Sequence, residues 1–317
     1  IQVNKPIMAH GTTLVNAIAL IVIVCCAVNT SEATAGEEVP LVVASVCMNA
    51  QTDKVVNLQT FQKYMLEAAT AGAHLVVFPE IALQQNPGWG KVSHKPADEE
   101  LAYVRETAEP IPGESTQLLI EKAQELGIFV VFGMTELGID EGLYNTSVFL
   151  GPEGILAAYR KHKLWDTTYG GNEHCSWDAG SVPGMVVDSP IGKVGLMICI
   201  EMMYEFGPPL AEAGAELLVT VSAWPESGGE LYDDFTVSNA EKASCWHIVA
   251  NQVGNVGHAV DYGHSRIIDP TGAIIADTGS EEGMVVCETG ILINPSTFST
   301  PITALETASW GKVKTTH

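Results

Sequence analysis

The sequence contains few positive charges for its length. Its 317 residues include 15 Lys and Arg against 38 Asp and Glu, and the formal net charge is −23 at pH 7. No basic cluster is longer than the stretch YRKHK at residues 159–163. Nucleic acids and anionic membranes are bound through positive patches that displace counterions. The sequence therefore argues against both as partners.

Motifs for cofactors and metals are also missing. The chain has no P-loop, no G-x-G-x-x-G and no G-x-S-x-G, and its seven cysteines include no C-x-x-C pair. The pair His174-Cys175 has no further ligands at a usable spacing. We therefore expect no cofactor, no metal and no disulfide framework. Outside the N-terminal segment, the spacing of the cysteines other than Cys199 favours no particular pairing of Cys47, Cys175, Cys245 and Cys287.

A short apolar segment lies near the N-terminus. Residues 14–28, LVNAIALIVIVCCAV, are too few for a comfortable membrane span, and the small residues Ala33-Thr34-Ala35 follow. We expect residues 1–35 to be a leader, a signal peptide cleaved near Ala35, and the protein to be secreted or otherwise outside the cytosol. An uncleaved anchor or a buried terminal helix are the alternatives. Residues 1–7, which precede Met8, belong either to the native chain or to an upstream read-in.

Apolar runs of strand length alternate with helix-period segments from residue 39 onwards. The spacing predicts a helix that contains Leu58, Phe61 and Met65, and another that begins with Ser115 as its N-cap and ends at Gly127. Two strand pairs are expected to turn at the segments GPEG and SPIG.

No internal repeat or linker interrupts this pattern. One α/β domain over residues 36–290 is the simplest interpretation. Residues 291–317 are rich in Ser, Thr and Pro and are expected to form a C-terminal extension.

Three residues stand where a predicted strand ends: Glu80 closes VVFPE, Lys161 follows LAAYR and Cys199 closes GLMIC. Side chains from several strand ends converge in open α/β folds. A thiol becomes a good nucleophile when a base takes its proton, and a buried carboxylate is a suitable base. A lysine, with the backbone N–H of Ile200, stabilises a tetrahedral oxyanion. Taken singly, the three read as a helix-start acid, a solvated lysine and a core cysteine, so the hypothesis rests on their combination.

The same segments resemble the three signature blocks of the nitrilase superfamily, the carbon–nitrogen hydrolases. The resemblance is carried by VVFPE, YRKHKLW and GLMICIEMMYE…GAELLVTVSAW and covers about residues 39–290. It implies a four-layer αββα sandwich and a Glu–Lys–Cys triad. In that triad Glu80 is the general base, Lys161 stabilises the oxyanion and Cys199 is the nucleophile. It also implies a thioester intermediate, release of ammonia or amine, and hydrolysis of the thioester by water.

The resemblance extends to a second acid and to the substrate pocket. Glu173, in the segment EHCSWDAG, fits the position of a second family glutamate, although it also reads as a solvent-facing loop carboxylate. The side chain after the nucleophile borders the substrate in this family, and tryptophans near the expected site loops are further candidates. The candidate pocket-lining residues are Ile200, Trp89, Trp165 and Trp224.

Two departures from the family pattern affect the interpretation. The lysine block commonly reads Tyr-Arg-Lys-x-His-Leu, and here Lys163 occupies the histidine position, so Lys163 competes with Lys161 as the catalytic lysine. True nitrilases usually show Trp-Glu after the cysteine, whereas this chain has Ile200-Glu201. Ile200 weakens the nitrile reading and leaves the amide reading open.

The leading hypothesis is a hydrolase that converts a small-molecule carboxamide into a carboxylate and ammonia or an amine. The alternatives are a nitrilase that acts on nitriles, a secreted amide hydrolase similar to the vanins and biotinidase, and an inactive scaffold of the same fold. The resemblance also suggests a homodimer or a larger homo-oligomer.

Overall fold

The computed structural model describes residues 24–25, 37–87, 96–166, 171–256 and 259–297. Most of the expected leader and Trp89 lie outside these residues. Within the leader, Val24–Cys25 form strand β1, which pairs in parallel with the C-terminal strand at Val286 and Cys287. Among the helices that the structure describes, none is long and apolar enough to cross a membrane.

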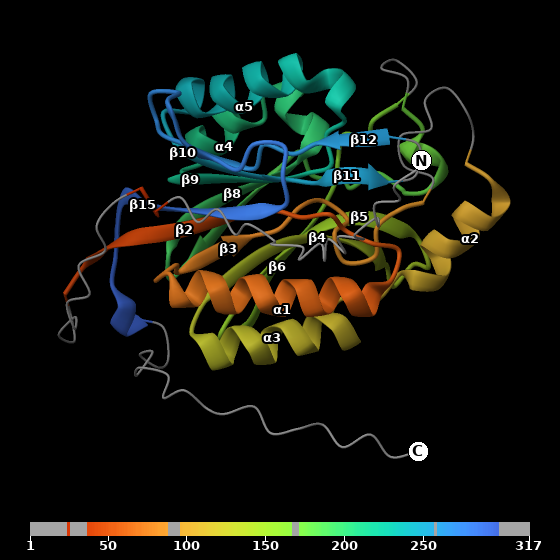
Figure 1. Cartoon of the computed structure of the whole chain (residues 1–317), viewed down its shortest axis with the longest axis horizontal. Coiled ribbons are helices and arrows are strands. Elements are labelled where there is room, and N and C mark those ends of the chain that lie inside the picture. The colour runs from red at the N-terminus through yellow and green to blue at the C-terminus, as the bar shows by residue number, and fades with distance from the viewer. Residues whose placement is uncertain (1–23, 26–36, 88–95, 167–170, 257–258, 298–317) are drawn as a thin grey trace, which may run out of the picture.

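Two β-sheets lie face to face, and helices cover the outer face of each (Figure 1). The seven-stranded sheet has the order β1-β15-β2-β3-β4-β5-β6. Its strands after β1 are β2 (Val39–Cys47), β3 (Leu75–Val77), β4 (Phe129–Leu137), β5 (Leu143–Gly151), β6 (Gly154–Arg160) and β15 (Gly283–Ile293). Helices α1 (Lys54–Thr70) and α3 (Glu114–Leu126) cover this sheet.

The six-stranded sheet has the order β14-β13-β10-β9-β8-β7. Its strands are β7 (Met185–Ser189), β8 (Gly192–Ile198), β9 (Leu217–Ser222), β10 (Trp246–Asn251), β13 (Arg266–Ile268) and β14 (Ile274–Asp277). Helices α4 (Gly207–Glu212) and α5 (Gly229–Ala243) cover its outer face. The predicted αββα sandwich and the single domain are confirmed. The elements that we did not expect include strands β1 and β15, helix α2 (Asp98–Thr107) and the hairpin of β11 (Val253–Val256) and β12 (Ala259–Tyr262).

The alternation of side chains along the strands produces two hydrophobic layers. On β2, Val43 faces the second sheet and packs in one cluster with Val219 of β9, while its neighbour Ala44 faces α1 and packs with Phe61 and Met65. Successive strand residues point to opposite faces, so a sheet covered on both sides needs apolar residues at consecutive positions. This is why β2 reads as a continuous apolar run.

Parallel strands form the centre of each sheet. Strands β2, β3 and β4 pair in parallel in the first sheet, and β8, β9 and β10 do so in the second. The carboxyl ends of parallel strands meet at one edge, where ligand sites form in α/β folds.

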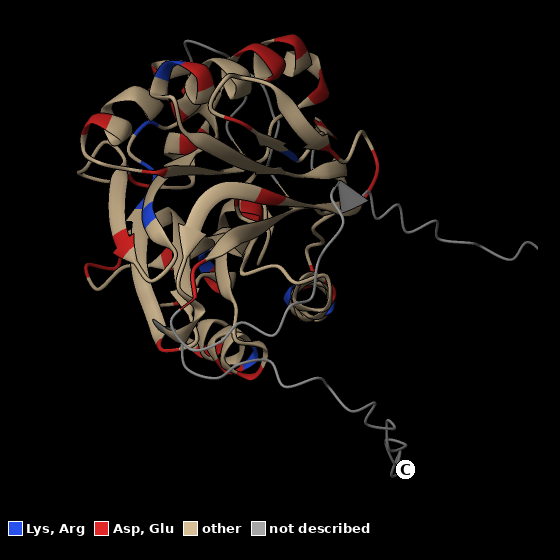
Figure 2. Ribbon diagram, turned by 90° about the vertical axis from the view of Figure 1, so that its left-hand side faces the viewer, with Lys and Arg blue, Asp and Glu red and all other residues tan. Residues whose placement is uncertain are grey.

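The acidic residues that dominate the net charge are spread over the outer helices and loops (Figure 2).

The start of α3 differs from the prediction. Gly113, not Ser115, is the N-cap residue, and the helix begins at Glu114. The Ser115 hydroxyl instead donates to Glu109 Oε1 over 2.6 Å, and the Ser115 N–H donates to Glu109 Oε2 over 2.9 Å. A carboxylate distant by several residues therefore satisfies the helix start, which a local capping pattern does not reveal. The helix end at Gly127, with φ of 66°, agrees with the prediction.

The C-terminal boundary of the sheet lies beyond residue 290. Strand β15 continues to Ile293, where Leu292 and Ile293 pair with Pro40 and Val39 of β2. The first three residues of the expected extension are thus part of the sheet. Residues 298–317 lie outside the described part of the chain.

Candidate active site

The three strand-end residues come from both sheets. Glu80 follows β3 and Lys161 follows β6, both in the seven-stranded sheet. Cys199 follows β8 of the six-stranded sheet and opens the short 3-10 helix η3 (Cys199–Tyr204). The relative position of the cysteine and the lysine therefore depends on how the two sheets are held together.

Lys161 lies between two carboxylates. Its Nζ is 2.7 Å from Glu80 Oε1 and 2.7 Å from Glu173 Oε1, and all three side chains have 0% exposure. Glu173 opens the 3-10 helix η2 (Glu173–Cys175) and points inward rather than into solvent. Lys163 is different: its side chain is 36% exposed and its Nζ is 3.9 Å from Asp166 Oδ2. The structure brings Lys161, and not Lys163, to the two glutamates.

The carboxylate of Glu80 has partners on both oxygens. Asn145 Nδ2 on β5 donates to Oε1 over 2.7 Å, and the Ala223 N–H after β9 donates to Oε2 over 2.9 Å. Gly133 on β4 allows the close approach, because a Cβ there would lie 2.5 Å from the Cα of Glu80. Asn145 begins the segment Asn145-Thr146-Ser147, which has the pattern of a glycosylation site. Its side chain is buried against Glu80, so this asparagine is not accessible in the folded protein.

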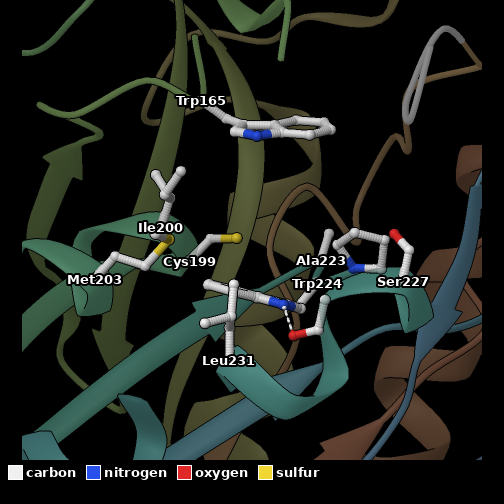
Figure 3. Close-up of a pocket in the computed structure, with 10 residues that line it drawn as sticks. Trp165, Cys199, Ile200, Met203, Ala223, Trp224, Ser227 and Leu231 are labelled. Carbon is white, nitrogen blue, oxygen red and sulfur yellow. Dashed lines mark hydrogen bonds between the residues drawn. The ribbon is translucent and has the colours of Figure 1, made fainter. Parts of the chain in front are cut away.

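Cys199 lies at a cavity of about 220 Å³. Its thiol points into the space between the rings of Trp165 and Trp224 (Figure 3). The structure also places Ile200 in the lining, together with residues that the sequence did not single out. These are Met203, Ala223, Pro225, Ser227, Gly228 and Leu231. The described lining is apolar apart from Ser227 and backbone groups.

The two tryptophans are held by hydrogen bonds. The indole N–H of Trp224 donates to the carbonyl of Gly228 over 2.8 Å, which fixes the ring at one side of the cavity. The backbone N–H of Trp165 donates to Glu173 Oε2 over 2.7 Å. Glu173 thus connects Lys161, through one oxygen, to a wall of the cavity, through the other.

Burial and charge set the protonation of the site. Burial raises the pKa of the Cys199 thiol well above its usual value and the charge of Glu80 adds to this, whereas Lys161 opposes it. Burial alone lowers the pKa of Lys161, but the charges of Glu173 and Glu80 outweigh it and raise that pKa well above normal. The cysteine is therefore a neutral thiol at rest and the lysine is a cation, so the thiol needs a base before it can attack.

The described residues contain no disulfide and no candidate metal site. No disulfide joins Cys47, Cys175, Cys199, Cys245 and Cys287 to one another in the described part of the chain. Within the same residues, no group of three or more His, Cys, Asp or Glu side chains could hold a metal ion.

Comparison with known proteins identifies the family. The family model described as carbon–nitrogen hydrolase matches residues 42–291. The chain belongs to the carbon–nitrogen hydrolase family. This carbon–nitrogen hydrolase is 30% identical over 261 residues to the deaminated glutathione amidase of Homo sapiens, covering 78% of this chain and 76% of that protein. It is 31% identical over 259 residues to the omega-amidase NIT2 of Danio rerio, covering 77% of this chain and 86% of that protein.

Solved structures agree on the fold. An amidase from Nesterenkonia sp. AN1, in a variant with acrylamide added at its active-site cysteine, superposes with a TM-score of 0.68 at 21% identity, covering 78% of this chain and 93% of that one. Another variant of that amidase, in complex with butyramide, gives a TM-score of 0.66 at 20% identity, covering 78% of this chain and 90% of that one. As a carbon–nitrogen hydrolase, the protein is an enzyme that acts on C–N bonds other than peptide bonds.

Proposed function

We propose that this carbon–nitrogen hydrolase is an amidase that converts a small carboxamide into a carboxylate and ammonia or an amine through a thioester on Cys199. The observation that supports this most is the buried Lys161, held between Glu80 and Glu173 and close enough to lower the pKa of the thiol. A fully buried lysine with two carboxylates is costly to build and is typical of a functional site. The similarity to named amidases supports the same reaction class.

The acylation half of the reaction begins with proton transfer. Glu80 takes the proton from the Cys199 thiol, and the sulfur attacks the carbonyl carbon of the amide. The Lys161 ammonium and the backbone N–H of Ile200 stabilise the oxyanion. When the intermediate collapses, the C–N bond breaks, and Glu80 returns its proton to the departing nitrogen. Ammonia or amine leaves and the acyl group remains as a thioester.

The deacylation half uses the same groups with water as the nucleophile. Glu80 takes a proton from water, and the resulting oxygen attacks the thioester carbonyl under the same two oxyanion donors. Collapse of this second intermediate breaks the C–S bond. The thiol regains its proton from Glu80, and the carboxylic acid leaves and loses its own proton to water. Glu173 holds Lys161 in place and takes no part in bond making.

Lys161 is the catalytic lysine in this proposal. It is buried with the two glutamates, whereas Lys163 is exposed and its Nζ lies 4.6 Å from the centre of the Tyr204 ring. An oxyanion is stabilised most strongly by a cation that is desolvated and already positioned.

Ammonia release from a panel of compounds tests the proposal. The panel contains simple amides, nitriles, ureido acids and pantetheine, the last followed by amine release. We expect the wild-type enzyme to hydrolyse amides and the Cys199→Ala variant to be inactive while keeping its melting temperature. Activity on nitriles alone would favour the nitrilase alternative. Equal activity in the two proteins, or none in wild type, would contradict the proposed mechanism.

We also propose that residues 1–35 direct export and are removed near Ala35, and that the mature enzyme forms a homo-oligomer. The apolar segment and the small residues Ala33 and Ala35 support the first proposal. The N-terminal sequence of the purified protein and the location of the full chain in cells that express it test the export proposal.

Sedimentation of the purified enzyme tests whether it forms a homo-oligomer.

A further inference from the structure

A third fully buried carboxylate lies two residues after the nucleophile and has no role in the proposed reaction. Glu201 is the third residue of η3, two positions after Cys199, and its exposure is 0%. Burial raises the pKa of this carboxyl, and the hydrogen bonds that it accepts oppose the shift. A buried carboxylate is retained only where its partners offset the cost of desolvation.

Glu201 accepts hydrogen bonds from two separate segments. Its Oε1 accepts from the Tyr159 hydroxyl over 2.7 Å, from the His162 N–H over 2.8 Å and from the Lys163 N–H over 3.1 Å. Its Oε2 accepts from the Ile198 N–H over 2.7 Å. All four partners are donors, and none of them is a charged side chain.

Three of these donors flank Lys161 in the sequence, and the fourth directly precedes Cys199. Tyr159 and His162 are on the segment that contains Lys161, at the end of β6 in the seven-stranded sheet. Ile198 ends β8 in the six-stranded sheet and directly precedes Cys199. One carboxylate thus joins the lysine segment of one sheet to the cysteine turn of the other.

The cysteine turn needs such a constraint. Cys199 has φ of 50°, in the left-handed region that is unfavourable for a residue with a side chain. The Glu201 side chain bonds the N–H of the residue before Cys199, so it closes a small ring around the strained position. Strained backbone persists at functional sites where surrounding contacts hold it in place.

We propose that Glu201 is a positioning residue that fixes the distance between Lys161 and the Cys199 thiol across the two sheets. The inference rests on the proposed thioester mechanism, in which the lysine and the thiol act on one carbonyl group. Errors of about 1 Å in such an arrangement reduce turnover by roughly a hundredfold. Both Glu201 oxygens act as acceptors, so a glutamine cannot replace it: its NH₂ would face an N–H or O–H donor.

The test compares Glu201→Gln with Glu205→Gln. Glu205 lies four residues further on, its side chain is 54% exposed and it pairs with Lys242, so its replacement controls for a Glu→Gln change outside the network. Ammonia release and alkylation of Cys199 by iodoacetamide are measured well below the melting temperature of each variant. For Glu201→Gln we expect kcat to fall by about 10- to 100-fold, KM to stay within about threefold because the cavity is intact, and alkylation to slow. Glu205→Gln should match wild type.

A folded Glu201→Gln variant with kcat within about twofold of wild type would overturn the inference. So would a loss confined to KM. If Glu201→Gln does not fold, Tyr159→Phe decides the question, since it removes one of the three donors to Oε1. A kcat reduced by about threefold or more at constant KM supports the inference, and an unchanged kcat overturns it. Cys199→Ala distinguishes a failure of the thioester mechanism from a failure of the positioning role. If Cys199→Ala is inactive while Glu201→Gln is fully active, only the positioning role of Glu201 is wrong.

Discussion

Two buried acidic centres contact the segment that carries Lys161, and they differ in their partners. In the first, Glu80 and Glu173 contact a lysine ammonium beside an apolar cavity. In the second, Glu201 contacts four neutral donors. All three carboxylates are equally buried. Burial therefore does not distinguish a reactive carboxylate from a structural one, and the partners do.

The partners determine which charges can change. Four neutral donors stabilise the ionised form of Glu201 and hold its carboxylate in one position. Around Lys161, two carboxylates share one cation, so moving a proton to or from a glutamate changes the local charge by one unit next to the thiol. Burial raises the pKa of Glu173 to about 7, with Glu80 adding to the shift and Lys161 opposing it. The first centre is thus suited to proton transfer and the second to rigidity.

Removing the proposed nucleophile or its base should have the largest effect on turnover. In Cys199→Ala and in Glu80→Gln we expect amide hydrolysis to fall by about a thousandfold or more, because acylation needs both the nucleophile and its base. Ammonia release measures the loss. Thermal unfolding should show both variants folded, and substantial turnover in either folded variant would argue against the mechanism.

Replacing the lysines one at a time should separate the buried from the exposed cation. Lys161→Met leaves Glu80 and Glu173 buried without their cation, and we expect a loss of about 3–5 kcal/mol in the free energy of unfolding together with loss of activity. Lys163→Met should cost about 0.5 kcal/mol or less, because its pair with Asp166 is exposed. Urea unfolding and ammonia release measure the two. The reverse ranking would mean that Lys163 is the catalytic lysine.

The charge of Glu173 should alter thiol reactivity in one direction with pH. Ionised Glu173 raises the pKa of Cys199, and Glu173 itself ionises as pH rises through about 7. Below that pH the wild-type carboxyl is protonated and resembles an amide, so Glu173→Gln and wild type should be alkylated by iodoacetamide at similar rates. Above it, the variant should react faster. The measurement is the ratio of the alkylation rate of Glu173→Gln to that of wild type between pH 6 and pH 8, about one pH unit either side of that pKa. A ratio that stays constant over this range would exclude this effect of Glu173.

A smaller effect is expected from removing a single donor in the second centre. Tyr159→Phe deletes a buried hydroxyl that donates to Glu201 and accepts from the Gly184 N–H. We expect a loss of about 1–3 kcal/mol in the free energy of unfolding, since buried polar groups lose a partner. Tyr144→Phe is the control, because the Tyr144 hydroxyl donates to Asp140 at the surface, and it should lose less. Urea denaturation of the two variants provides the comparison, and equal losses would contradict the assignment.

The local pattern of the sequence was enough to predict many of the strands and the strand-end positions of Glu80, Lys161 and Cys199. Apolar runs and turn residues specify strands over short distances, and a residue that follows such a run lies at a sheet edge. The helix end at Gly127 was predictable for the same reason. The start at Gly113 was not, because Glu109, which bonds the first turn of that helix, comes from a preceding segment.

The choice between Lys161 and Lys163 could not be made from the sequence. The pairing of β6 with β5 shows which lysine lies beside the glutamates: the Lys161 N–H donates to the Asn145 carbonyl over 2.8 Å, which aligns the lysine with the strand whose asparagine contacts Glu80. Successive residues of a strand point to opposite faces, so Lys161 and Lys163, two apart, would share a face if the strand continued. Strand β6 ends at Arg160, and beyond it Lys161 is buried while Lys163 is exposed.

What the sequence by itself determined is the order of elements, the αββα fold and the identity of the reactive residue types, because these follow from hydrophobic period and from family motifs. The tertiary structure alone decided which groups each carboxylate contacts. Glu201 is adjacent to Cys199 in sequence, yet its oxygens bind Tyr159 and the backbone beside Lys161. Glu80 is far from Cys199 in sequence, yet it lies at the thiol and the lysine. The physical reason is that charges and hydrogen bonds act over a few ångströms in space, and the packing of two sheets sets those distances.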